Sequence, residues 1–129
     1  MIDLFFWDSS SVIKIHDSII DKYGGLHGLK DGLNSLESAL NRPKDYYYYE
    51  SYDVPKMAAI YIHAIAAGHV FNDGNKRTAT KIAEIFLIRN GYYLLIDNFF
   101  LGELVLGIAS NKIELSYLVK QFSIFSEPL

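Results

Sequence analysis

Apolar residues recur at helical spacing in several stretches of this chain, each bounded by residues that favour the start or the end of a helix. Residues 9–23 begin with three serines and continue with apolar side chains three or four positions apart, until two glycines follow at 24 and 25. This spacing aligns the apolar side chains on one helical face, and glycine is favoured just beyond a helix C-terminus. The pattern predicts a first helix over residues 9–23.

A second, shorter helix is predicted from the leucines at positions 33, 36 and 40. Pro43 follows them, and proline disfavours a helical conformation in the residue before it, so we expect the helix to end there. The next segment, residues 45–52, includes four consecutive tyrosines at 46–49 and is predicted to be irregular. These tyrosines suit either packing against the bundle or a flap that receives a substrate.

The most apolar part of the chain, residues 54–71, predicts a third helix. Asp53 is a suitable N-cap, and Pro55 falls in the first turn, where proline is tolerated. A lysine and two histidines interrupt the stretch, and a membrane-spanning helix would bury them at considerable cost. We therefore expect a core helix that ends near His69 and lies in the middle of a bundle.

A fourth helix is predicted to begin at about Asn75, after a turn through residues 70–74. Apolar side chains at helical spacing face the core along it, and the pair Asn90 and Gly91 is a common signal for a helix C-terminus. Residues 92–96 are predicted to form a short extended segment.

Two further helices are predicted, around residues 101–109 and 113–125. Asn111 and Glu114 have the spacing of a capping box for the last one. The fold class is therefore all-α, a bundle of about six helices. A chain of 129 residues that is 50% apolar can build one core but not two of ordinary size, so we expect a single domain over residues 1–129.

Charge and cysteine content narrow the possible functions. The formal net charge is −3 and the basic residues are scattered, so nucleic acid is not expected as a direct partner. The chain has no cysteine, which excludes disulfides, thiolate metal sites and a cysteine nucleophile. Its first residues lack the positive leader of a secretory signal. We expect a cytoplasmic protein that does not enter a membrane.

The candidate chemistry lies in residues 69–77, His-Val-Phe-Asn-Asp-Gly-Asn-Lys-Arg, between the two most strongly predicted helices. The start of a helix presents unpaired N–H groups and the positive end of the helix dipole, which favour an anion such as phosphate. Gly74 allows the backbone a close approach to a ligand. Lys76 and Arg77 oppose the dipole by about 0.3–1 kcal/mol each, a penalty that a bound anion reverses.

Asp73 and His69 supply two further groups of this candidate site. A single carboxylate beside a phosphate site suits Mg²⁺, which completes its coordination with phosphate and water. His69 is the nearby residue whose titration suits removal of a proton from an attacking hydroxyl. The stretch therefore predicts a site for ATP and Mg²⁺. The alternative is a tight turn and helix cap with no chemistry.

The same nine residues resemble the signature of the Fic/Doc family, and specifically its Doc (death-on-curing) branch. The likeness covers most of the chain, because further stretches resemble Doc-type sequences in order and spacing: residues 15–17, 22–26, 36–43 and 87–91. The resemblance implies that His69 is the base and that Asp73 holds Mg²⁺. It also implies that the anion hole for the ATP phosphates consists of Gly74, Asn75, Lys76 and Arg77.

The resemblance further implies a biological role. Doc proteins are toxins of bacterial toxin–antitoxin modules that phosphorylate elongation factor Tu and stop translation, whereas most Fic relatives transfer AMP. Fic enzymes that restrain themselves carry a Ser/Thr-x-x-x-Glu-Gly/Asn motif, and the nearest match here, Thr80 to Glu84, is followed by Ile85. We therefore expect control by a separate Phd-type antitoxin, whose disordered tail folds into a groove of the toxin.

Two positions bear on which group is transferred. AMP-transferring members read Gly-Asn-Gly-Arg, with a second arginine three residues later, where this chain has Lys76 and Thr80. Lys76 should crowd the usual α/β-phosphate seat, which favours phosphoryl transfer. Gly74 matches the AMP-transferring pattern. However, a difference of one methyl group at position 74 changes the site less than the charge and volume of Lys76 at position 76. A protein phosphotransferase is predicted; an adenylyltransferase and, in another class, a catalytically idle partner-binding module are the alternatives.

The other histidines have no spacing typical of metal ligands, and we assign no catalytic role to His16, His27 or His63. Arg42 and Lys44 also stay outside the predicted site, because the sequence gives no distance from them to it.

Overall fold

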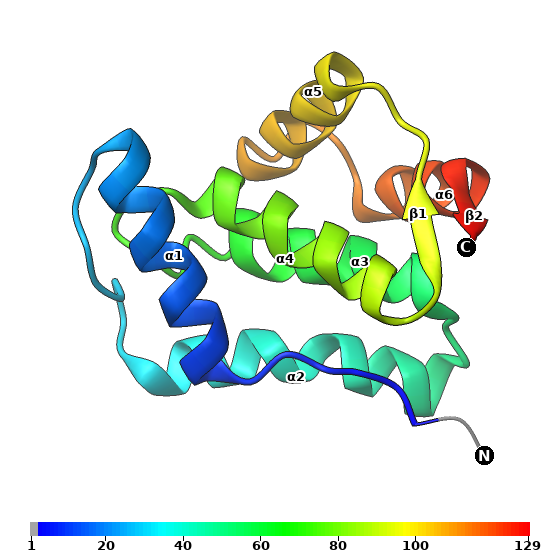
Figure 1. The fold of residues 1–129 in the computed structure, drawn as a ribbon, viewed down its shortest axis with the longest axis horizontal. Helices are drawn as coiled ribbons and strands as arrows, with labels where there is room; N and C mark the ends of the chain where they lie inside the picture. Colours follow the sequence, from blue (N-terminus) through cyan, green and yellow to red (C-terminus); the bar gives the residue numbers. More distant parts are fainter. Residues whose placement is uncertain (1–2) are drawn as a thin grey trace.

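The computed structural model describes residues 3–129 and confirms an all-α bundle with six α-helices in that range. The helices are α1 (Ser9–Tyr23), α2 (Leu33–Glu50), α3 (Val54–Ile62), α4 (Asn75–Arg89), α5 (Asn98–Ala109) and α6 (Leu115–Phe125). A π-helical turn, η1 (His63–Ala67), continues α3. In Figure 1, α3 and α4 form the middle of the molecule, with α1, α2, α5 and α6 around them.

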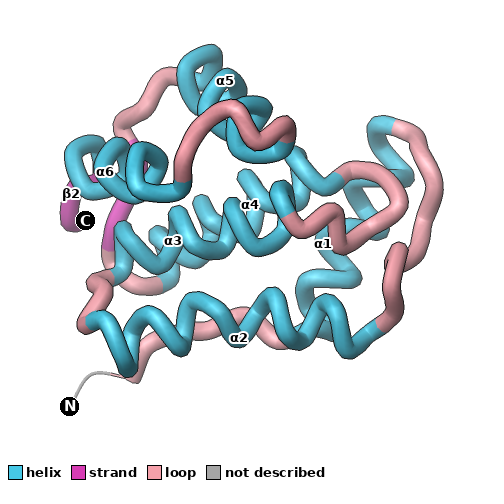
Figure 2. Tube along the Cα trace, turned by 180° about the vertical axis from the view of Figure 1, so that it is seen from behind, coloured by secondary structure: helices cyan, strands magenta, loops and turns pink. Residues whose placement is uncertain are grey.

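Helix α3 is the centre of the core, as predicted. Each of its residues except Lys56 is buried, and it contacts α2, α4 and α6; Figure 2 shows α2 running beneath it. Asp53 caps it by accepting a hydrogen bond from the Lys56 N–H at 3.1 Å, and the buried Tyr61 hydroxyl accepts one from the Trp7 N–H. Within residues 3–129, no helix is long and apolar enough to cross a membrane.

Helix α2 is longer than predicted, and the prediction that residues 45–52 are irregular is wrong for residues 45–50. The helix passes through Pro43 and ends at Glu50, although an interior proline costs about 3 kcal/mol through its lost N–H and its ring contacts. Pro43 is buried, and two of the four tyrosines pack on other rings: Tyr46 lies 4.8 Å from Tyr52, and Tyr47 lies 6.1 Å from Phe6. Tyr48 and Tyr49 are exposed. The aromatic packing of Tyr46 and Tyr47 stabilises the longer helix.

The two C-terminal helices also differ from the prediction. Helix α5 begins at Asn98, three residues earlier than expected, because Asp97 caps it by accepting a hydrogen bond from the Phe100 N–H. The predicted capping box at Asn111 is wrong. Asn111 has a φ of 61° in the turn that ends α5, and Glu114 itself is the N-cap position of α6.

The extended segment predicted after α4 is confirmed as β1 (Tyr92–Leu94). It pairs antiparallel with β2 (Ser126–Pro128), a strand that the sequence did not indicate. In Figure 1 the two strands meet at the end of the bundle where α6 lies.

Candidate active site

The site is built on the loop that joins η1 to α4, residues 68–74, which we call the His69 loop. Gly68 ends η1, and a Cβ at this position would overlap the carbonyl oxygen of Ala64. His69 follows with a φ of 48°, a left-handed conformation that is strained by about 1–2 kcal/mol in a residue other than glycine. Its side chain is exposed. Strained, exposed residues next to a π-turn are typical of functional sites.

The N-terminus of α4 has open backbone donors. Gly74 is its N-cap, with a φ of 76°, and the first intrahelical bond runs from the Thr78 N–H to the Gly74 carbonyl at 3.0 Å. The three N–H groups before it, at positions 75–77, therefore have no intrahelical acceptor. A Cβ at Gly74 would lie 3.0 Å from the Ile20 side chain and 3.5 Å from His16. Glycine is thus favoured by the backbone conformation, and a larger residue would need a small shift of the Ile20 side chain.

Asn75 holds the His69 loop with its side chain. Its Oδ1 accepts a hydrogen bond from the Phe71 N–H at 2.8 Å, and its Nδ2 donates one to the Phe71 carbonyl at 2.9 Å. Both ends of the amide are therefore engaged by the backbone. Asn75 can still offer its backbone N–H and the second N–H of its side-chain amide to an anion.

Asp73 is oriented from a distant part of the chain. One oxygen of its carboxylate, Oδ2, accepts a hydrogen bond from the Leu26 N–H at 2.7 Å. The side chain is exposed, and no residue between 3 and 129 bonds to its other oxygen, Oδ1. A carboxylate fixed through one oxygen and open at the other fits a Mg²⁺ ligand whose orientation is set by its neighbours.

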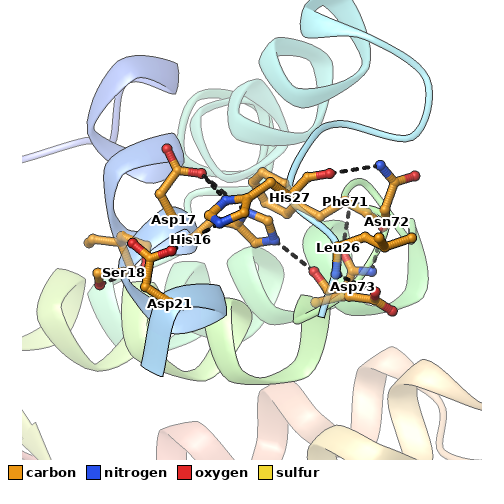
Figure 3. A network of polar contacts seen from close by, with 11 residues as sticks. His16, Asp17, Ser18, Asp21, Leu26, His27, Phe71, Asn72 and Asp73 are labelled. Atoms are coloured by element: carbon orange, nitrogen blue, oxygen red, sulfur yellow. Dashed lines mark hydrogen bonds and ion pairs between the residues drawn. The ribbon is translucent and has the colours of Figure 1, made fainter. Parts of the chain in front are cut away.

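His16 is a site residue that the sequence reasoning missed. It is only 1% exposed, its ring stacks on Phe71 with centroids 3.8 Å apart, and its Nε2–H donates a hydrogen bond to the Asp73 carbonyl at 2.7 Å. Figure 3 shows this ring of α1 lying against the His69 loop. No local pattern could have shown the contact, because His16 and Asp73 are 57 positions apart.

A groove of about 730 Å³ lies between α1, α4 and α5. Four of the predicted site residues line it, Gly74, Asn75, Lys76 and Arg77, whereas His69 and Asp73 do not and lie on the exposed loop before α4. Basic and apolar side chains also line it, among them Lys22, Lys81, Ile19, Val105 and Leu106.

Two side chains give the groove its electrostatic character. The Arg77 guanidinium lies 4.2 Å from the centre of the Tyr23 ring, so α1 holds this cation at the groove through a cation–π contact. Glu84, farther along α4, is half-buried in the lining, and burial raises the pKa of its carboxyl above the usual value. The groove is therefore basic at the start of α4 and has one carboxylate farther along.

The protein is an all-α bundle in which the His69 loop leads into the core helix α4 beside a basic groove. This arrangement is typical of a Fic-type protein. The sequence profile of the Fic/DOC family matches residues 6–87, and the chain belongs to this family. It is 40% identical over 106 residues to Protein kinase doc of Escherichia phage P1, a match that covers 81% of this chain and 82% of that protein. The resemblance to the Doc branch is thereby confirmed.

Proposed function

We propose that this protein is the toxin of a bacterial toxin–antitoxin module and that it phosphorylates a hydroxyl of a protein target, elongation factor Tu, with ATP and Mg²⁺. The observation that carries the proposal is the open N-terminus of α4, where unbonded N–H groups, Lys76 and Arg77 line one groove next to the oriented carboxylate of Asp73. The identity with a relative named as a protein kinase supports transfer of phosphate.

Each predicted residue has a role in this reaction. ATP supplies the γ-phosphoryl group, and Mg²⁺ neutralises phosphate charge. Asp73 would hold the metal with its carboxylate, and the N–H groups of residues 75–77, with Lys76 and Arg77, would bind the phosphates. His69 takes the proton of the attacking hydroxyl as the new O–P bond forms and ADP leaves.

Adenylyl transfer is the second candidate function, and Gly74 is the observation that favours it. Gly74 matches the AMP-transferring pattern, and its φ of 76° is a conformation that favours glycine. Lys76 weighs against this candidate because it adds a long cation to the groove lining. The two reactions leave different masses on the target.

The proposed partner is a Phd-type antitoxin. The groove between α1, α4 and α5 mixes apolar and basic side chains, a surface suited to a segment that folds on binding. If the protein only binds such a partner and is catalytically idle, it will engage the antitoxin but leave elongation factor Tu unmodified.

The deciding experiment is an intact-mass measurement of elongation factor Tu after incubation with this protein, ATP and Mg²⁺. We expect a gain of one phosphate, and a loss of about 10²–10⁴-fold in rate for His69→Ala, the range for removal of a general base. The variant must keep its wild-type circular dichroism and thermal midpoint, since the His69 side chain is exposed.

Each other outcome has a defined meaning. A gain of AMP establishes the second candidate. No mass change on this target contradicts the proposed function, and a folded His69→Ala variant with undiminished activity contradicts the role of His69.

A further inference from the structure

His27, in the loop between α1 and α2, lies between two carboxylates of α1. Its Nδ1 is 3.0 Å from Asp17 Oδ1, and its Nε2 is 3.0 Å from Asp21 Oδ1. A carboxylate only accepts hydrogen bonds, and a neutral imidazole has only one N–H, so both bonds form together only when the ring is an imidazolium. Asp17 and Asp21 are one helical turn apart, which is the spacing that lets them hold one ring from both sides.

The segment that carries His27 is bonded along its length to the His69 loop. This segment, residues 24–32, is called the α1–α2 loop here. Two backbone hydrogen bonds join the loops: the Lys30 N–H donates to the Val70 carbonyl at 2.9 Å, and the Asn72 N–H donates to the Gly28 carbonyl at 3.0 Å. Together they make an antiparallel β-bridge between Leu29 and Phe71.

Side-chain contacts continue this junction on both sides of His27. Its carbonyl accepts a hydrogen bond from the Asn72 side-chain amide at 3.1 Å, and the N–H of the preceding Leu26 holds the Asp73 carboxylate. Figure 3 shows the two carboxylates, the His27 ring and the His69 loop as one connected network. The position of His27 therefore sets the position of the residue that orients Asp73.

We propose that Asp17, His27 and Asp21 form a clamp that positions the α1–α2 loop, and through it the Asp73 carboxylate, with the imidazolium as the closed form. The three are positioning residues, because they reach the site only through backbone contacts. The effect on activity rests on the proposed function, whereas the effect on the loop does not.

The clamp should open as the pH rises. The hydrogen bond to Asp17, and then the charge and hydrogen bond of Asp21, raise the pKa of His27 above its usual value. The clamp is thus complete below the ordinary histidine pKa of about 6.5 and is lost as the pH rises through the raised value. The other charged or titratable groups around it are His16, whose Nδ1 lies 3.9 Å from Asp17, and Asp73.

Amide hydrogen exchange tests the clamp without any assay of activity. Exposed ion pairs add little to global stability, so His27→Gln should keep the wild-type unfolding midpoint. At low pH it should speed exchange several-fold at the amides that join the loops, those of Leu26, Lys30 and Asn72. The ratio of the amide exchange rate in His27→Gln to that in the wild type should fall to one at pH values above the His27 pKa. Unchanged exchange at these amides at every pH overturns the proposal.

Three further variants separate a charge effect from a loss of side chain. His27→Arg keeps a cation that does not titrate, so it should hold the loop at high pH as well as at low pH. Asp21→Asn should shift the transition to lower pH, because one of the two carboxylates that stabilise the imidazolium is gone. Asp45→Asn, the same change at an exposed position of α2, should leave exchange unchanged. If Asp45→Asn shifts the exchange transition as much as Asp21→Asn does, the clamp is not the cause of the shift.

The activity readout is phosphate transfer to elongation factor Tu as a function of pH. The ratio of wild-type to His27→Gln rates should be about tenfold at low pH, the lower range for loss of an outer positioning partner, and should approach one at high pH. A pH-independent ratio contradicts the clamp. If the wild type modifies nothing, the proposed function fails, and the exchange data alone decide on the clamp.

Discussion

At the scale of single residues, the His69 loop is held by side chains that take no part in the proposed chemistry. His16 supports it through the Asp73 carbonyl, and Asn75 closes it on the backbone of Phe71. These bonds fix the backbone around Asp73 before any ligand arrives, and such preorganisation strengthens a charged site. The loop is therefore held by hydrogen bonds at Phe71 and Asp73, although His69 and Asp73 are exposed.

His16→Phe tests this support. Phenylalanine keeps the stacking on Phe71 but cannot donate to the Asp73 carbonyl, and loss of one hydrogen bond of this kind should cost about 1 kcal/mol. The measurement is the urea midpoint, read with the slope of unfolding. We also expect a reduced rate of transfer, since the carbonyl marks the position of Asp73. Wild-type stability and rate together would show that stacking alone holds the loop.

Lys76→Gly tests which phosphate faces the base. It restores the Gly-Asn-Gly-Arg pattern and removes a cation from the groove lining, so we expect less phosphoryl transfer and a gain of adenylyl transfer. Incubation with α-labelled and γ-labelled ATP, in parallel with the wild type, measures the ratio. A variant that transfers only the γ-phosphate would show that Lys76 does not select the product.

At the scale of elements, helix ends and helix irregularities place the site. The π-helical turn η1 and Gly68 end the core helix with a conformation that presents His69, and Gly74 starts α4 in a left-handed conformation. The groove in turn depends on how α5 packs on α4 and faces α1 across the groove. A substitution that moves α5 should therefore change the shape of the groove.

Two glycines of α5 form a matched pair for testing its packing. A Cβ at Gly107 would overlap the side chain of Ile113, whereas a Cβ at Gly102 meets nothing within 4 Å. Gly102→Ala should therefore stabilise the protein by about 0.5–1 kcal/mol through helix propensity. Gly107→Ala should destabilise it by about 1–3 kcal/mol through overpacking. Urea unfolding of both variants measures the difference. Equal shifts of the urea midpoint would show that Ile113, in the turn after α5, moves aside at little cost.

At the scale of the whole molecule, two histidines respond to pH in opposite directions. His27 titrates above the usual value, as described, whereas burial and the charge of Arg42 lower the pKa of His63. The Arg42 Nη1–H donates to His63 Nδ1 at 2.9 Å, a bond that requires the neutral ring. The clamp thus weakens on the alkaline side, and the contact between α2 and η1 weakens on the acidic side.

The loss of stability at acidic pH can be tested by substitution of His63. Its folded pKa is below the unfolded value of about 6.5, so the unfolded chain takes up a proton first, and stability should be lost as the pH falls from about 6.5 through the lowered pKa. His63→Gln should remove this loss, seen as a flatter dependence of the urea midpoint on pH. If the urea midpoint of the variant depends on pH as it does in the wild type, another group causes the loss of stability at acidic pH.

Local sequence determined much of this protein. The start and end of α1 and α4, the cap of α3 at Asp53 and the extended segment at β1 were predictable, because caps, glycines and helical periodicity act between near neighbours. The nine residues from His69 to Arg77 predicted a site at the start of a helix, and that helix does begin at Asn75. Their roles stay predictions until activity is measured.

Only the tertiary structure decided the rest. The passage of α2 through Pro43, the pairing of β1 with β2 and the support of Asp73 by His16 and Leu26 join residues that the sequence does not relate. Each depends on packing or on a hydrogen bond between segments far apart in the chain. Such contacts override local preferences, because several of them together add an energy comparable to the cost of a proline or an unusual backbone angle.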